Sequence, residues 1–385
     1  MKNPALRFKH ADGTDFPNWE NKKIGNILSI FHGKDYHGIP EGEIPVLGTS
    51  GKIASVSKAL CSWPCVLIGR KGTINRPQYM ESPFWPVDTI FYSKPKEKNN
   101  VKFQYYLFQT ISWMKFNEAS GVPSLNASTI ESISIHTPNI EEQKKIADFF
   151  STLDEKISLS ERRVEQLEQL KKGLMQKIFS REIRFLQADG TDFPDWLQMK
   201  ISDFADLLTG FPFESSKFTT DGIRLVKGAN IKRGNLSFAK ESSSYWPSMN
   251  GLQKFELNEG DLLIQMDGAL VGKSYGIVTK DILPAILVQR VTRVRCNSAK
   301  LQILYQYFWI GDFDKFIKKT VTNTAVPHIS LTDISSFEIM LPSSQIELEK
   351  LAEFLGCLER KIDLSKIKLM KIKKLKKAFM QQMFV

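Results

Sequence analysis

The chain contains the same stretch of sequence twice. Residues 11–17 (ADGTDFP) recur without change at residues 188–194, an offset of 177. A second repeat has an offset of 205, and it sets residues 153–157 against 358–362 and residues 175–179 against 380–384. Because the offset grows by 28, the second half holds 28 more residues between its repeated ends. The chain therefore consists of two copies of one frame, each enclosing a different insert.

Length and charge limit what such a chain can be. With 385 residues, of which 42% are hydrophobic and 25% charged, it is long enough for two or three domains with their own cores. A net charge of +11 favours a polyanionic partner such as nucleic acid. We expect no secretion signal and no membrane span, because no apolar run is long enough, and so a cytoplasmic protein. The four cysteines are expected to be reduced thiols.

Apolar residues follow a heptad pattern before each repeated end. The pattern predicts one long helix with a seam from Ile146 to Ile178 and a matching one with a seam from Leu351 to Met383. The polar breaks in the pattern, Ser160 and Lys171, recur as Ser365 and Lys376, which favours pairing of the helices. The alternative is that each amphipathic helix docks on its own domain and is otherwise solvated. The predicted seam comprises Ile146, Phe150, Leu153, Ile157, Val164, Leu167, Leu174, Ile178, Leu351, Leu355, Leu358, Ile362, Leu369, Ile372, Phe379 and Met383.

The two inserts, roughly residues 20–138 and 197–342, have mixed character. Short β-branched and aromatic runs bounded by Gly, Pro and Asn predict strands. These runs cover residues 44–47, 65–68, 89–92, 261–264 and 275–278, and final strands are expected at 130–137 and 334–341. Helices are expected around residues 103–115 and 301–319. Each insert is therefore predicted to be an α+β domain with a twisted sheet.

No catalytic or metal-binding motif is complete. Residues 267–274 (DGALVGKS) resemble a phosphate-binding loop, but Asp267 replaces its first glycine and a strand pattern follows where a helix is needed. Pro194-Asp195 could begin a nuclease motif, but the repeat has Pro17-Asn18 in the same place, so this carboxylate is interpreted as structural. The five histidines lack the spacing of metal ligands. No methyl-donor site is visible either.

The arrangement of insert, long helix, second insert and second helix resembles the DNA-specificity subunit of type I restriction-modification systems. Residues 121–125 (GVPSL) and the run from Glu142-Gln143 to Ile157 carry the likeness, together with residues 44–48, 66–75 and 84–89 of the first insert and residues 210–213 and 261–273 of the second. The second copy departs from the pattern at Glu347-Leu348 and at residues 325–328 (AVPH).

The resemblance implies a fold and a division of labour. Two target-recognition domains, residues 1–140 and 181–345, would be joined by two long antiparallel coiled-coil helices, residues 141–180 and 346–385, with pseudo-twofold symmetry. Such subunits are non-catalytic, and each domain reads one half of a bipartite, asymmetric target in double-stranded DNA. Modification subunits, two by this symmetry, would dock on the helices, and restriction subunits would join through them. S-adenosylmethionine, ATP and Mg²⁺ would belong to those partners, whose complex is an adenine-N6 methyltransferase and an ATP-dependent deoxyribonuclease.

The length of the seam suggests that the helices set a fixed distance between the two domains. The 33 residues from Ile146 to Ile178 span roughly 50 Å as a helix, somewhat more than one turn of duplex DNA. For DNA contact we select basic and amide side chains on Gly-rich loops, because Arg and Lys suit guanine or phosphate and Asn suits adenine. An ordinary solvated surface role is the alternative for each. The candidates are Lys52, Arg70, Lys71, Asn75 and Arg76 in the first insert and Lys227, Asn230, Lys232, Arg233, Lys273 and Asn323 in the second.

Trp19 and Trp196 lie in the repeated frame and are predicted to be packing anchors. Two other functions remain open from the sequence: a self-sufficient methyltransferase or nuclease fused to recognition domains, and a coiled-coil scaffold without a DNA role. Activity of the purified chain without partners would support the first. Absence of salt-dependent DNA binding would support the second.

Overall fold

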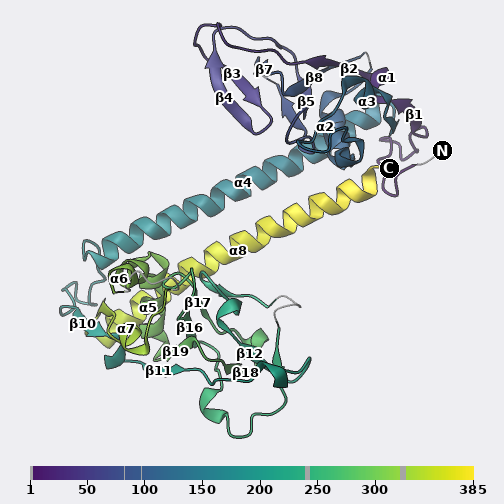
Figure 1. The fold of residues 1–385 in the computed structure, drawn as a ribbon. Coiled ribbons are helices and arrows are strands. Elements are labelled where there is room, and N and C mark those ends of the chain that lie inside the picture. The colour runs from purple at the N-terminus through teal and green to yellow at the C-terminus, as the bar shows by residue number, and fades with distance from the viewer. Residues whose placement is uncertain (1–2, 82, 97, 239–242, 321–326) are drawn as a thin grey trace. The chain divides into compact units, whose positions relative to one another are not determined.

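Each heptad region forms one continuous helix in the computed structural model: α4 spans Ile140–Phe179 and α8 spans Gln345–Met383. The structure describes residues 3–81, 83–96, 98–238, 243–320 and 327–385 (Figure 1). It divides into two units, each described by itself below. Unit 1 comprises Met1–Arg163 and Ser365–Val385, and unit 2 comprises Val164–Leu364. Each unit therefore contains one head and half of each long helix.

The head of unit 1 is built on a four-stranded antiparallel sheet of order β2-β8-β5-β6, beside a three-stranded sheet of order β4-β3-β7 in which β3 and β7 run parallel. A pair of strands, β1 and β9, closes the domain next to α4. The elements are β1 Glu20–Lys23, α1 Ile24–Ile27, β2 Leu28–His32, β3 Ile44–Gly48, β4 Gly51–Val56, β5 Cys65–Gly69, β6 Gln78–Met80, β7 Trp85–Pro86, β8 Ile90–Pro95, α2 Val101–Thr110, a 3₁₀ helix Trp113–Phe116, α3 Ala127–Ser132 and β9 Ser134–Thr137.

The head of unit 2 has the same strand order from different sequence. Its four-stranded sheet is β11-β19-β16-β17, its three-stranded sheet is β15-β12-β18 with β12 and β18 parallel, and β10 pairs with β20. The elements are β10 Leu197–Lys200, β11 Asp206–Thr209, β12 Ile223–Val226, β13 Ile231–Lys232, β14 Asn235–Leu236, β15 Tyr245–Trp246, β16 Leu262–Gln265, β17 Tyr275–Ile277, β18 Ala285–Leu287, β19 Val291–Arg295, α5 Ser298–Trp309, α6 Asp312–Thr320, α7 Leu331–Ser335 and β20 Glu338–Leu341, with 3₁₀ helices at Ile201–Asp203, Ser215–Lys217, Gly228–Asn230, Gln253–Phe255 and Lys280–Ile282.

The largest elaboration of the second head lies between two of these matched strands. Only Thr49 and Ser50 separate β3 from β4, whereas residues 227–244 separate the corresponding strands β12 and β15. This segment contains the small hairpin β13–β14. Much of the extra length that the repeat offsets revealed is therefore used to extend one hairpin of the sheet.

The repeated ADGTDFP segment forms the same structure in each unit. Its Asp12 carboxylate accepts hydrogen bonds from the backbone N–H (3.0 Å) and hydroxyl (2.6 Å) of Thr14, which lower the pKa of Asp12. Gly13 between them has φ +86°, a conformation that favours glycine. Asp189, Gly190 and Thr191 repeat this turn in unit 2, with the same two distances.

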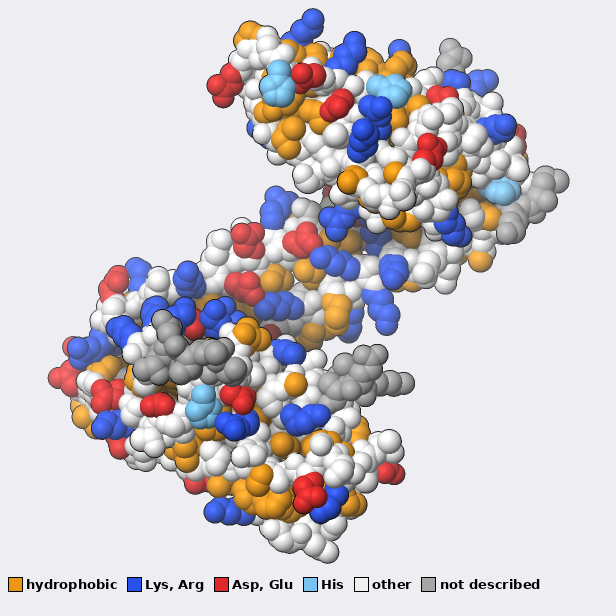
Figure 2. Space-filling view, in the orientation of Figure 1, with side chains coloured by type: hydrophobic (Ala, Val, Ile, Leu, Met, Phe, Trp, Pro, Cys, Tyr) orange, Lys and Arg blue, Asp and Glu red, His pale blue; other side chains and the backbone are white. Residues whose placement is uncertain are grey.

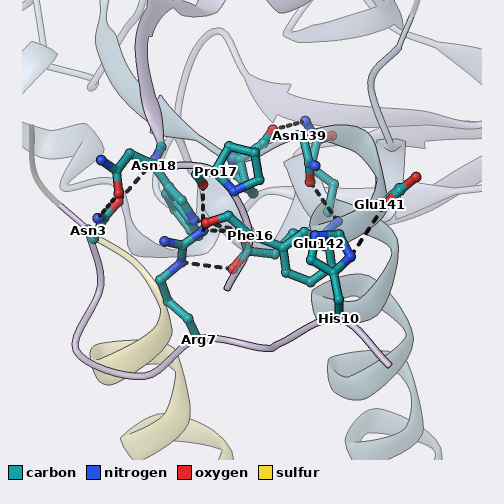
Figure 3. Close-up of polar contacts among 12 residues, drawn as sticks. Asn3, Arg7, His10, Phe16, Pro17, Asn18, Asn139, Glu141 and Glu142 are labelled. Carbon is teal, nitrogen blue, oxygen red and sulfur yellow. Dashed lines mark hydrogen bonds and ion pairs between the residues drawn. The ribbon is translucent and has the colours of Figure 1, made fainter. Parts of the chain in front are cut away.

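In each unit, one arginine forms hydrogen bonds both to the end of this repeated segment and to the first turn of a long helix. Arg7 donates to both carboxylate oxygens of the fully buried Glu142, at 3.1 and 2.7 Å, and to the carbonyl of Pro17 at 2.7 Å (Figure 3). Arg184, Glu347 and Pro194 make the matching contacts in unit 2. A bidentate pair between a guanidinium and a buried carboxylate fixes orientation, so the repeat is structural in both copies.

The tryptophans that follow the turn are buried, as predicted: Trp19 is 1% and Trp196 5% exposed. Trp19 Nε1 donates to Glu142 at 3.2 Å, whereas Trp196 Nε1 is buried without a hydrogen-bond partner among the described residues. The departure at Glu347-Leu348 also has a local consequence. Gln143 bonds to the backbone of Asn100 and Pro138, and its counterpart Leu348 instead packs in the apolar core.

Within each unit the two long helices pack against each other and run in opposite directions. In unit 1, Phe149 contacts Phe379 with ring centroids 5.1 Å apart, and Asp154 bonds to Lys376. In unit 2, Lys171 bonds to Glu359, and the ends of both helices share one apolar cluster. All sixteen predicted seam residues are buried or half-buried. The helices thus use their heptad faces against each other as well as against the heads.

Four predicted elements were wrong in part. Residues 130–132 and 334–335 are helical rather than extended, because Asn126 caps the N-terminus of α3 and Ser330 that of α7, so only β9 and β20 are strands. The helix expected over residues 103–115 ends at Thr110 and continues as a 3₁₀ turn. The helix expected over 301–319 is two helices, since Gly311 (φ +89°) breaks the chain between α5 and α6. The five shorter strand predictions are confirmed.

Candidate nucleic-acid interface

In the first head three of the predicted basic residues, Arg70, Lys71 and Arg76, lie on the loop between β5 and β6, whereas Lys52 lies in strand β4 and not on a loop. Gly72 adopts φ +87° at the bend, and its N–H donates to the carbonyl of Pro123 at 2.8 Å. Arg70 and Lys71 precede this glycine, with backbone bonds to Thr89 that hold the loop to the sheet. The GVPSL segment singled out in the sequence therefore anchors the loop that carries the candidates.

The tip of the β3–β4 hairpin meets this loop. Gln78 donates through Nε2 to the carbonyl of Thr49 at 3.4 Å. Hairpin and loop border an open hollow of about 520 Å³. It is lined by Thr49, Ser50, Asn75, Arg76, Pro77, Gln78, Tyr105 and Gln109. Amide, guanidinium and phenol groups thus converge on one concave surface, of a kind suited to the edges of bases.

Sequence reasoning predicted only Asn75 and Arg76 among these lining residues, and it missed Gln78, Tyr105 and Gln109 among the others. Tyr105 and Gln109 are four residues apart on α2, which places them on one face of that helix. Gln109 is exposed at the last turn. In the sequence, the available signal was a polar side chain four residues after a tyrosine in a predicted helix. Only the fold shows that this helix face lies beside the β5–β6 loop.

The second head places its candidates at the corresponding edge. Gly268 (φ +93°) donates its N–H to the carbonyl of Pro327 at 3.0 Å, as Gly72 does to Pro123. Lys273 lies two residues before β17, and Arg76 lies two residues before the corresponding strand β6. The hydrogen bond from the glycine N–H to the proline carbonyl is therefore kept in the second head, although the sequence around the proline changes from GVPS to AVPH. The loop that resembled a phosphate-binding motif is a turn leading into a strand, as predicted.

The extended hairpin of the second head supplies the other candidates. Lys227, Lys232 and Arg233 lie on residues 227–244, the segment inserted between β12 and β15. The N–H of Gly234 donates to the carbonyl of Tyr275 at 2.8 Å, so the hairpin lies along β17 and next to the loop that carries Lys273. In both heads, an arm of the three-stranded sheet thus meets the central loop of the four-stranded sheet. We call this junction the recognition edge.

Accessibility separates the candidates. Lys52, Lys71, Asn75, Arg76, Lys232, Arg233 and Lys273 are exposed, whereas Arg70 and Lys227 are half-buried. The Nζ atom of Lys227 donates to Ser244 at 2.9 Å and lies over the ring of Phe218. Asn323 lies outside the described residues.

Asn230 requires a correction. It is fully buried, its Oδ1 accepts from the N–H of Lys227 at 3.0 Å, and its Nδ2 donates to the carbonyl of Ser237 at 3.2 Å. A fully buried amide that is hydrogen-bonded through both its oxygen and its nitrogen cannot reach a base edge. Asn230 shapes the extended hairpin instead.

The described residues contain no cluster of three His, Cys, Asp or Glu side chains able to hold a metal ion. The pKa of the Cys65 thiol is raised by its hydrogen bond with Cys61 and by burial, and burial raises that of Cys296 to about 11. These thiols stay protonated at neutral pH and are not poised nucleophiles. None of the helices in the described part of the chain is long and apolar enough to cross a membrane.

Comparison with known proteins agrees with this geometry. Residues 17–169 and 194–374 match the family model of the type I restriction modification DNA specificity domain. The chain is 26% identical to the type I restriction enzyme MjaVIII specificity subunit of Methanocaldococcus jannaschii, over 97% of this chain and 94% of that protein. It is 22% identical to the MjaIX specificity subunit of the same organism, over 99% and 88% of the two chains.

A solved structure shows the same fold. The type I restriction-modification S subunit from M. genitalium superposes with a TM-score of 0.72 at 14% identity, covering 100% of this chain and 99% of that one. The two family matches fall on the two copies of the frame and their inserts. The chain belongs to the family of type I restriction-modification DNA-specificity proteins.

Proposed function

We propose that this chain is the non-catalytic subunit that directs a type I restriction-modification complex to a bipartite, asymmetric target in double-stranded DNA. One observation carries the proposal: the two heads share one strand order, but their recognition edges are built from different residues and hairpins of different length. Equal scaffolds with unlike edges suit two unlike half-sites, which a symmetric dimer of one head could not read.

The recognition edges supply the contacts in this proposal. Arg and Lys bind phosphates or guanine edges, and Asn and Gln suit adenine. The set is Lys52, Arg70, Lys71, Asn75, Arg76, Gln78 and Gln109 in the first head and Lys227, Lys232, Arg233, Lys273 and Asn323 in the second. Asn230 is excluded by its burial.

The partners follow from the frame. The ion pair of Arg7 with Glu142 and that of Arg184 with Glu347 repeat one local structure in both units, and this repeat supports two docking positions for modification subunits. Restriction subunits join through those subunits. In this proposal S-adenosylmethionine, ATP and Mg²⁺ belong to the partners. The complex acts in the cytoplasm, where it meets DNA.

Sequencing of methylated bases in a host with and without this gene tests the proposal. We expect one split motif, with adenine methylation in both halves, to disappear when the gene is deleted and to return when it is restored. A methylome that is unchanged by the deletion would overturn the proposal.

The alternative of a self-sufficient enzyme is tested with purified chain. Methyl transfer or cleavage by the chain without partners would favour that alternative. We expect the chain alone to bind duplex DNA weakly and with steep salt dependence, and the complex to bind tightly and specifically.

A further inference from the structure

The apolar seam of the long helices is repeated in both units, but the charge on the helices differs between the units. In unit 1, residues 140–163 of α4 and 365–383 of α8 carry 12 basic and 6 acidic side chains. In unit 2, residues 164–179 and 345–364 carry 6 basic and 7 acidic side chains. Because both units build the same frame contacts, that frame does not require the positive excess of unit 1.

The excess lies on α8. Residues 366–377 include seven lysines and no acidic residue. The positions 205 residues earlier on α4 differ: Lys373 corresponds to Glu168, and Lys374 to Gln169. Part of this charge is neutralised, because Lys373 pairs with Glu161 at 2.7 Å. Lys377 is exposed and has no ion-pair partner in the described part of the chain.

These lysines border a hollow that continues the recognition edge of the first head. Lys373, Lys376 and Lys377 line an open pocket of about 590 Å³ together with Gln109 and Thr110 at the end of α2. Gln109 also lines the hollow that holds Asn75 and Arg76. The two hollows therefore adjoin within unit 1. Lys and Arg side chains gather along this part of α8 on the face drawn in Figure 2.

One lysine of the group has a structural role. Lys376 bonds to Asp154 at 2.6 Å, lies over the ring of Tyr106 at 5.3 Å, and has a side chain only 17% exposed. Lys373 keeps 51% of its side chain exposed despite its ion pair. Lys373 and Lys377 are thus the two ammonium groups of the pocket that can reach a ligand.

We propose that Lys373 and Lys377 on α8, called the lysine track below, bind the sugar-phosphate backbone of duplex DNA beside the half-site read by the first head. The inference rests on the proposed function. Lysine ammonium groups bind phosphates as point charges and release condensed counterions, so the contact adds affinity and salt dependence without reading sequence. It makes DNA binding by the two units unequal, with the larger electrostatic contribution in unit 1.

The test compares two double variants of the full chain. Lys373→Gln with Lys377→Gln removes the track. Lys172→Gln with Lys177→Gln is the matched control, because Lys172 corresponds to Lys377 and Lys177 is ion-paired with Glu182 at 2.9 Å as Lys373 is with Glu161. Each double variant removes two charges from exposed helix positions. Affinity for a mixed-sequence duplex of about 30 base pairs is measured from about 50 to about 200 mM salt.

We expect the track variant to lower the slope of log affinity against log salt by nearly 2, at about 0.9 for each phosphate contact, and to weaken binding about tenfold to 100-fold near 0.1 M salt. The control should match the wild type in slope. In the host, the track variant should keep the methylated motif, since backbone contacts carry no base information.

Three results would overturn the inference while leaving the proposed function intact. These are an unchanged slope in the track variant, an equal loss in both double variants, and a loss of modification-subunit binding with unchanged DNA binding. The last would identify a protein-docking surface. Melting curves like that of the wild type show that the variants are folded. A wild-type chain that does not bind duplex at low salt would count against the proposed function itself.

Discussion

Two lysines at the same repeated position, Lys171 and Lys376, have different energetics in the two copies. Lys171 is 2% exposed, bonds to Glu359 at 2.7 Å and lies 4.1 Å from the centre of the Trp309 ring. Its counterpart Lys376 is paired with Asp154, but those side chains are 17% and 36% exposed. Glu359 also accepts hydrogen bonds from Gln302 and Gln306, which lie on α5 of the second head.

Glu359→Ala should therefore destabilise the protein much more than Asp154→Ala. Removing Glu359 takes a carboxylate away from a buried ammonium group, at a cost of about 3 to 5 kcal/mol. The more solvated pair of Asp154 should cost about 1 kcal/mol. Denaturant unfolding of the two variants measures the difference. Equal costs would contradict the assignment of Lys171 as the more deeply buried partner.

Arg233→Ala tests the recognition edge at the same scale. Arg233 is exposed on the extended hairpin of the second head. If it contacts a base, binding of the complex should weaken by about 1 to 3 kcal/mol and discrimination should relax at one position of the second half-site. If it contacts phosphate, the salt slope should fall by about 1. Asn258→Ala, outside the edge, serves as a control, and an Arg233 variant that behaves like it would remove Arg233 from the set.

At the scale of elements, the sequence was most informative where a period repeats. The two predicted heptad seams, from Ile146 to Ile178 and from Leu351 to Met383, each lie within one continuous helix, because a long apolar seam outweighs local preference. Helices α3 and α7 were missed because they are only six and five residues long and are set by side-chain caps. The edge candidates were found by residue type, but the burial of Asn230 and the approach of Gln109 depend on contacts between distant segments.

The helices provide an element-scale prediction. Inserting one heptad within residues 153–174, with the matching insertion within residues 358–379, keeps the seam in phase and lengthens each helix by about 10 Å. The gap between the two halves of the methylated motif should then grow by a few base pairs, while each half keeps its sequence. Methylome sequencing reads both quantities. A gap of unchanged length would show that the helices do not set it.

At the scale of the whole molecule, the frame closes on itself in the same way at both of its ends. Leu6 donates its N–H to the carbonyl of Gln382 at 3.0 Å, and Ile183 donates to the carbonyl of Lys177 at 3.2 Å. Leu6 corresponds to Ile183 by the offset of 177, and Gln382 corresponds to Lys177 by the offset of 205. In unit 2 the two bonded residues belong to one continuous stretch of chain, whereas in unit 1 they come from distant parts of the sequence. Each head is thus held by one equivalent frame and has its own core.

The central claim is that the two heads read the two halves of the target independently. Exchanging residues 20–138 for the corresponding insert of another family member, in a host that carries the modification subunit, tests it by methylome sequencing. The account predicts that one half of the methylated motif changes while the other half and the gap stay as they were. A folded, partner-bound hybrid whose motif changes in both halves would contradict it.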